Sequence, residues 1–179
     1  MLATVLIVSL AAVFKLSDTV KAVTATSISI NASATSLCAY SPITITATIN
    51  GGSSPKASSI EWATNSSTGT FSSPTSTSTT STVTYVDTSS GTVTITASYP
   101  GDSNNGASSS AVTLTIYNLD FLHEGVVNFQ DVVYFAQAYI AYQTSNVYNA
   151  AIDLNHDGVI NFNDITLFVA LYDSYQGPV

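Results

Sequence analysis

A twelve-residue segment near the C-terminus, 153–164, carries oxygen-bearing side chains at regularly spaced positions. Calcium binds about six to eight oxygen atoms in a flexible loop. Gly158 at position six permits the sharp turn that such a loop needs, because glycine adopts positive φ at little cost. Side-chain oxygens at positions one, three, five, nine and twelve, with the backbone carbonyl at position seven, would supply the ligands. We therefore predict a Ca²⁺ site formed by Asp153, Asn155, Asp157, Asn161, Asp164 and Val159.

A second copy of this pattern lies upstream, at an offset of 33 residues (153 minus 120), over 120–131. A glycine stands at position six in both copies, and the core Gly-Val-[Val/Ile]-Asn-Phe-x-Asp is shared, which indicates duplication. Position three is Leu122, which has no oxygen to offer, so we expect this copy to bind Ca²⁺ weakly or to serve only as a scaffold. Its candidate ligands are Asp120, Glu124, Val126, Asn128 and Asp131.

Each acidic segment is followed by apolar residues at helical spacing, over 132–142 and 165–172. With Asp at position twelve and Asn at position nine, the two copies resemble dockerin type I repeats. That resemblance implies a small α-helical domain over 118–179, in paired EF-hand-like loop–helix form, that docks onto a cohesin module. The family recognises its partner with positions ten and eleven, here Phe129-Gln130 and Phe162-Asn163. These phenylalanines depart from the family's usual residues, so packing on the rest of the chain or on a neighbouring subunit is the alternative.

The stretch 23–117 alternates apolar residues with threonine and serine, as in 43–50, 92–98 and 112–117. Alternation with period two is typical of half-buried antiparallel strands. About seven short strands separated by glycine-containing turns predict an immunoglobulin-like antiparallel β-sandwich, so the fold class is mainly β. The stretches 69–71, 84–85 and 91–102 together resemble the Ig-like repeats of bacterial and archaeal surface proteins, which implies a spacer, an adhesive head or an assembly unit.

Residues 1–22 contain an apolar run over 2–14, which is shorter than the roughly 18 residues of a membrane span. We expect a helix here, with three alternatives: an assembly helix, a secretory signal ending near Ala22, or a membrane anchor. The stretch 3–14 resembles the N-terminal helix of archaeal type IV pilin-like subunits, which packs into a filament core. That resemblance implies burial between copies of the chain.

Composition limits the partners of this chain. Its net charge is −8, with three lysines and no arginine, so it could not neutralise the phosphates of a nucleic acid. His123, His156 and the single cysteine, Cys38, do not supply the three or four convergent ligands that zinc needs. We predict neither an enzyme nor a small-molecule substrate. Two sequons suit an exported chain and mark Asn31 and Asn65 as candidate glycosylation sites.

The leading hypothesis is a structural subunit of an extracellular filament, pilus or cell-surface assembly. Copies of the chain would be its partners, and Ca²⁺ would stabilise the C-terminal domain. The alternative is a secreted adaptor whose dockerin binds a cohesin-bearing scaffold. A third hypothesis is an adhesin whose Ig-like face binds a glycan or a host surface.

Overall fold

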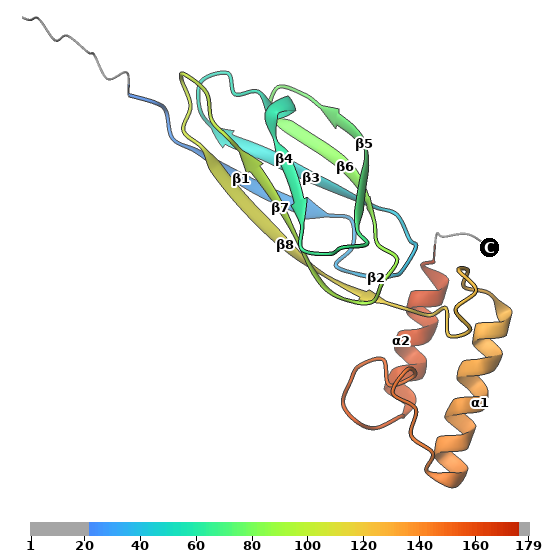
Figure 1. Cartoon of the computed structure of the whole chain (residues 1–179). Coiled ribbons are helices and arrows are strands. Elements are labelled where there is room, and N and C mark those ends of the chain that lie inside the picture. Colours follow the sequence, from blue (N-terminus) through green and yellow to red (C-terminus); the bar gives the residue numbers. More distant parts are fainter. Residues whose placement is uncertain (1–21, 176–179) are drawn as a thin grey trace, which may run out of the picture.

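The computed structural model describes residues 22–175, which form a β-sandwich followed by two helices (Figure 1). The predicted alternation decides which face of each strand is buried. In β7 (Gly91–Tyr99), Val93, Ile95 and Ala97 are buried, whereas the threonines between them are partly exposed. Successive side chains of a strand point to opposite faces, so apolar residues face the second sheet and β-branched hydroxyls face outward.

Two four-stranded sheets pack face to face. In the described residues, one sheet has the strand order β1-β3-β6-β5 and the other the order β2-β8-β7-β4. The remaining strands are β1 (Thr26–Ala32), β2 (Ser36–Cys38), β3 (Ile43–Gly51), β4 (Glu61–Thr64), β5 (Thr70–Ser76), β6 (Thr80–Val86) and β8 (Ser108–Tyr117). A short 3₁₀ turn, Ala57–Ser59, precedes β4. The prediction of a β-sandwich is confirmed.

The sequence prediction was incomplete in two respects. Within residues 22–175 there are eight strands rather than about seven, and β2 pairs with β8 in parallel, so the sandwich is not wholly antiparallel. β2 is only three residues long, and β5 is mostly exposed serine and threonine, so neither shows clear apolar alternation. β5 is an edge strand with a bulge between Ser72 and Thr75, and Pro74 is tolerated there because an edge position requires no ladder donor.

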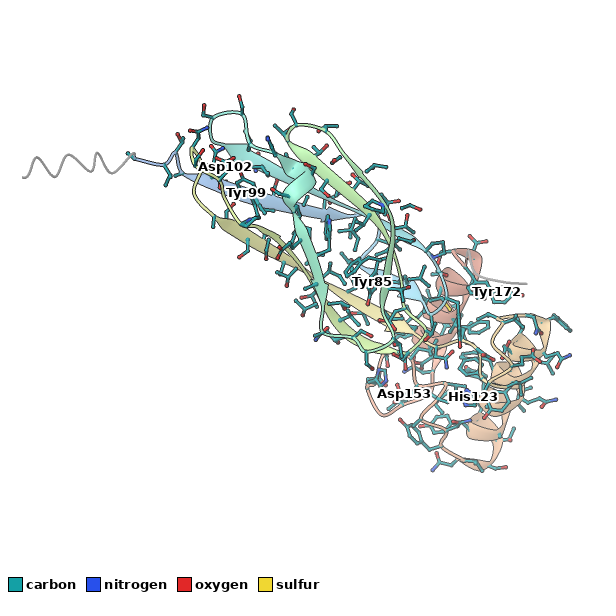
Figure 2. All side chains as sticks on the ribbon, turned by 45° about the horizontal axis from the view of Figure 1, so that its top comes forward. Tyr85, Tyr99, Asp102, His123, Asp153 and Tyr172 are labelled. Carbon is teal, nitrogen blue, oxygen red and sulfur yellow. The ribbon has the colours of Figure 1, made fainter. Side chains whose placement is uncertain are left out.

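The sandwich interior contains two tyrosines whose hydroxyls are paired with carboxylates. Tyr85 and Tyr99 are 0% and 1% exposed, and they donate hydrogen bonds to Asp87 Oδ2 (2.6 Å) and Asp102 Oδ2 (2.7 Å), respectively. Tyr99 and Asp102 lie at the end of the sandwich far from the helices (Figure 2). Trp62 is half-buried against this core, and its Nε1 donates to Ser81 Oγ at 3.2 Å, so it is a packing residue.

Two helices follow the sandwich: α1 (Phe129–Ser145) and α2 (Phe162–Asp173). They contain the predicted helical segments 132–142 and 165–172. The helices lie side by side and run in opposite directions (Figure 1), with the rings of Phe135 and Phe168 stacked between them at 4.4 Å between centroids.

The helices pack at one end of the sandwich, opposite the end where the described chain begins (Figure 1). A second core joins the two parts, since Cys38 of β2 is buried together with residues of both helices and their loops. The predicted N-terminal helix lies outside the described residues. Within residues 22–175, neither helix is long and apolar enough to cross a membrane.

Candidate calcium-binding loops

The two acidic segments form loops with the same internal hydrogen bonds. At position one, Asp120 accepts bonds from the backbone N–H groups of Glu124 (3.0 Å) and Gly125 (2.7 Å). In the second loop, Asp153 accepts the equivalent bonds from Asp157 (3.2 Å) and Gly158 (2.9 Å). In each loop, one carboxylate therefore fixes the turn at positions five and six. The repeat in the sequence is also a repeat in three dimensions.

The aspartate at position twelve joins each loop to the start of its helix. Asp164 Oδ1 accepts from Leu154 N (2.9 Å) and Asn155 N (3.4 Å), while its Oδ2 accepts from Asn161 N at 2.8 Å. Asp131 makes the equivalent bonds in the first loop. Asn161 caps α2 in return by accepting from Asn163 N, which completes a capping box. Asn161 and Asp164, which were predicted as calcium ligands, thus also form the N-terminal cap of α2.

Two backbone positions with positive φ close each loop. Gly125 and Gly158 have φ of 86° and 84°, as the turn at position six requires. His123 and His156, both at position four, also have positive φ, of 59° and 58°. Both histidines are exposed loop residues, and their left-handed backbone was not predicted from the sequence. Histidine is among the residues enriched there, which is the only signal in the sequence.

The structure brings most of the predicted ligands of the second loop into a single hydrogen-bonded network. Asn155 Nδ2 donates to Asp157 Oδ2 at 2.9 Å, and Asn161 Nδ2 donates to the backbone oxygen of Val159 at 3.4 Å. Asn155, Asp157 and Val159 are exposed, whereas Asp153 is buried. Among residues 22–175, no group of three His, Cys, Asp or Glu side chains converges as a metal site by itself. The expected ligand set depends equally on amide and carbonyl oxygens.

The first loop uses its position-five residue differently. Glu124 Oε1 accepts a hydrogen bond from Asn128 Nδ2, which joins positions five and nine directly. Leu122, at position three, is 43% exposed and offers no oxygen atom. In the first loop, therefore, the predicted ligands Glu124 and Asn128 contact each other, and the residue at position three, Leu122, is apolar.

Four carboxylates are buried in this part of the chain without a cationic side chain. Asp120, Asp131, Asp153 and Asp164 are each at most 2% exposed, and 118–179 contains no lysine or arginine. Burial acts to raise the pKa of Asp153, but the Tyr148 hydroxyl and the backbone N–H groups of Gly158 and Asp157 outweigh it and lower that pKa. A buried carboxylate that stays charged is stabilised by such donors or by a metal ion. A set of oxygen donors that includes these aspartates fits Ca²⁺.

Tyr148 is a site residue that the sequence analysis missed. Its hydroxyl donates to Asp153 Oδ2 at 2.5 Å, from the linker that precedes the second loop. This hydrogen bond, together with partial desolvation, raises the pKa of Tyr148 to about 12. The residue 33 positions earlier is Thr115, in β8, so the first loop has no equivalent tyrosine and repeat comparison could not reveal this contact.

The chain has a distant structural likeness among known proteins. No family model matches the chain, and no curated protein matches it. Among solved structures, the chain is similar to the adhesin InvE of Yersinia pseudotuberculosis, with 19% identity and a TM-score of 0.36. The match covers 51% of this chain but only 26% of that adhesin. At this level the likeness carries no argument about function.

The remaining predicted site residues lie on the surface. Phe129 and Phe162 are both 72% exposed, so packing of these rings on the rest of the described chain is wrong, whereas packing on a neighbouring subunit stays a prediction. Asn31 and Asn65 are exposed as well, and Asn65 Oδ1 accepts from Thr94 N at 2.8 Å. Their glycosylation stays a prediction.

Proposed function

We propose that this chain is a non-enzymatic structural protein of the cell exterior, whose second loop binds Ca²⁺ and whose partners are copies of itself. Calcium would hold the loop–helix pair in one conformation against the end of the sandwich. The ion stabilises the folded chain because it binds the formed loop and not the unfolded segment.

The observation that carries the calcium proposal is the pair of buried aspartates in each loop. The side chains of Asp153 and Asp164 are removed from water, in a segment without any lysine or arginine of its own. Backbone N–H groups compensate part of this cost, and a divalent cation coordinated by the remaining oxygens would compensate more. The first loop shares this frame but lacks an oxygen at position three, so we propose that the second loop is the tighter site.

The calcium proposal is tested by titration of the full chain with Ca²⁺, measured by isothermal calorimetry. Asp157→Ala removes the exposed position-five oxygen of the second loop, and Glu124→Ala removes its counterpart in the first loop. We expect Asp157→Ala to weaken the tightest binding at least tenfold, and Glu124→Ala to leave it within about twofold. Equal effects of the two substitutions, or no heat of binding to the unmodified chain, would contradict the assignment.

The assembly proposal is supported by the arrangement of the described chain. The sandwich receives its N-terminal strand at the end opposite the helices (Figure 1), so an N-terminal contact and a helix contact would occupy opposite ends of one subunit. Contacts at opposite ends favour head-to-tail arrays over closed dimers. We expect the full chain to sediment as oligomers and a chain lacking residues 1–22 to sediment as a monomer. Monomeric behaviour of both chains would count against self-assembly.

A second candidate function is a secreted adaptor that docks on a cohesin-type protein. The exposure of Phe129 and Phe162 favours it, since each stands at position ten of its loop and neither is buried within residues 22–175. Pull-down with a purified cohesin module is the test, with Phe162→Ser and Phe129→Ser together as the variant. Retention of the unmodified chain but not of the double variant would favour the adaptor over the structural subunit.

A further inference from the structure

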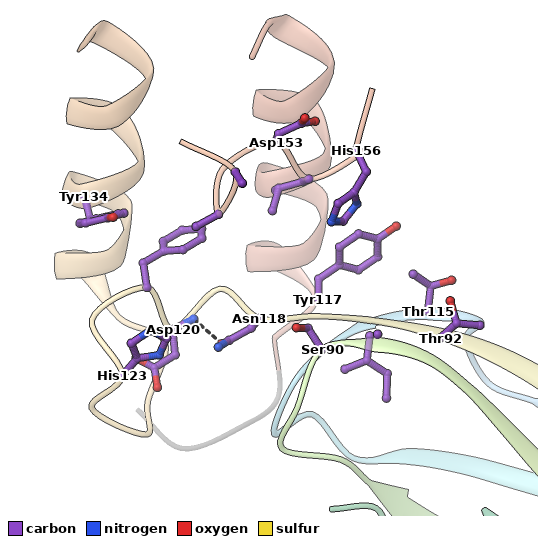
Figure 3. A pocket seen from close by; sticks show the side chains of 16 residues that line it. Ser90, Thr92, Thr115, Tyr117, Asn118, Asp120, His123, Tyr134, Asp153 and His156 are labelled. Atoms are coloured by element: carbon purple, nitrogen blue, oxygen red, sulfur yellow. Dashed lines mark hydrogen bonds between the residues drawn. The ribbon is translucent and has the colours of Figure 1, made fainter. Parts of the chain in front are cut away.

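A cavity of about 470 Å³ lies between the end of the sandwich and the two loops. β7 and β8 form one wall, and the loops with the linker before the second loop form the others (Figure 3). This volume lies in the range of about 300 to 1,000 Å³ that is usual for small-molecule sites. Two predicted calcium ligands, Asp120 and Asp153, line this cavity, whereas exposed ones such as Asn155 and Asp157 do not.

The walls of the cavity carry hydroxyl and imidazole groups that can donate or accept hydrogen bonds. Thr92 and Thr115 are directly opposite each other on neighbouring strands, so their hydroxyls form a pair on the sandwich wall. On the loop side, His123 and His156 reach the cavity from the equivalent positions of the two loops (Figure 3). A neutral imidazole has one donor and one acceptor, and a hydroxyl offers both, as sugar hydroxyls also do.

Two phenol rings add apolar surface to these polar groups. Tyr117 lies beside His156, and Tyr134 lies on the opposite side of the cavity (Figure 3). Tyr134 is held in place, because its ring stacks on Phe121 at 5.5 Å between centroids and its hydroxyl accepts from Asn149 Nδ2 at 3.1 Å. Aromatic faces in fixed positions offer dispersion contacts to the apolar face of a flat ring.

The charges of the lining exclude ionic ligands. The described residues that line the cavity include no lysine or arginine, so a phosphate, sulfate or carboxylate would find no counter-charge. Two carboxylates, Asp120 and Asp153, line it as well, and they would repel an anion. Both are predicted calcium ligands that accept hydrogen bonds within their own loops, and at most 2% of each residue is exposed, so they present little surface to an organic cation.

We propose that this cavity binds a neutral saccharide. Paired threonine hydroxyls on one wall and two imidazoles on the other would contact its hydroxyl groups, and the tyrosine rings would contact the apolar face of its ring. Binding is expected in the millimolar range, because the lining offers hydrogen bonds and ring contacts but no lysine, no arginine and no exposed carboxylate.

The test is nuclear magnetic resonance of the full, ¹⁵N-labelled chain with glucose, galactose, mannose, N-acetylglucosamine, maltose and lactose, each at about 10 mM. Glucuronic acid and glucosamine serve as charged probes. We expect at least one neutral sugar to shift the amide signals of Thr92, Thr115 and His156, and the charged probes to have no effect there. The absence of such shifts with all six neutral sugars, or equal shifts with glucuronic acid, would overturn the proposal.

A matched pair of variants locates the binding. Thr115→Tyr fills the cavity, whereas Thr113→Tyr places the same bulk on the same face of β8, two residues away and outside the cavity. His156→Gly removes one imidazole, and glycine accepts the positive φ of that position. We expect Thr115→Tyr and His156→Gly to weaken the sugar-induced shifts at least tenfold, and Thr113→Tyr to preserve them. Equal binding by Thr115→Tyr and Thr113→Tyr would show that the sugar binds elsewhere and would refute the site.

Discussion

At the scale of single residues, Asp87 shows how this chain keeps a buried charge without a cation. It is 1% exposed, and it accepts hydrogen bonds from the hydroxyls of Tyr85 and Thr68 and from the backbone N–H of Ser89. Burial acts to raise its pKa, but hydroxyl donors, with Ser66 and Thr68 foremost, outweigh this and lower the pKa of Asp87 to about 2. The carboxylate is therefore favoured in the folded state.

A depressed pKa makes stability depend on acid. Asp87 titrates near 3.8 when unfolded and near 2 when folded, so its contribution is complete above the unfolded value and is lost as pH falls through the folded one. We expect the free energy of unfolding of the unmodified chain, relative to Asp87→Asn, to shrink by about 2 kcal/mol between pH 6 and pH 2. Urea unfolding at several pH values measures this difference. A difference that stays constant would contradict the assignment.

The first loop offers a gain-of-function test at one residue. Leu122→Asn introduces the missing oxygen at position three, where Asn155 stands in the second loop. The side chain is 43% exposed, so little apolar packing is lost. We expect calorimetry to show a second Ca²⁺ site, or at least a tenfold gain in affinity at the weaker one. The control is Val159→Asn, which introduces the same side chain at an exposed position of the second loop and should add no Ca²⁺ site. Leu154 is buried, so Leu154→Asn would not serve as a control.

At the scale of elements, the duplicated loop–helix unit was the part of the fold most predictable from sequence. The glycine, the asparagine at position nine and the aspartate at position twelve define both the turn and the capping box, so the helix starts follow from local chemistry. The predicted ligand positions follow from the same spacing. What local chemistry cannot supply is the contact of Tyr148 with Asp153, which depends on where the linker between the two units passes.

Helix capping and metal binding can be separated by the two equivalent asparagines. Asn128→Ala and Asn161→Ala each remove an N-cap, so each should lower the free energy of unfolding by about 1 kcal/mol in the presence of a chelator. With calcium added, we expect the loss for Asn161→Ala to grow, because this residue is also a predicted ligand of the tighter site, while the loss for Asn128→Ala changes little. Thermal unfolding with and without Ca²⁺ measures both. Identical behaviour of the two variants would argue against unequal sites.

At the scale of the whole molecule, the sequence predicted the two parts but not how they meet. Strands β3, β7 and β8 follow from their alternation, whereas β2 has three residues and no pattern of its own. Yet β2 carries Cys38 into the core that is shared with the helices, and the strand lies against α2. Contacts between distant segments leave no periodic signal, so neither this core nor the cavity beside it could be derived from spacing.

The reaction rate of the Cys38 thiol can report whether the helices stay packed against β2. It is the only cysteine of the chain and is 1% exposed, and burial raises its pKa to about 11, so the native thiol is both shielded and protonated. A thiol reagent should react only when the helices separate from β2. If calcium stabilises the helical pair, the thiol of the full chain at pH 8 should react at least tenfold more slowly with Ca²⁺ than with chelator. Each factor of ten in rate corresponds to about 1.4 kcal/mol of stabilisation.

The control is Asp157→Ala, in which the two rates should be the same. Equal rates in the unmodified chain would mean that metal binding, if measured by calorimetry, does not hold the helices against the sandwich.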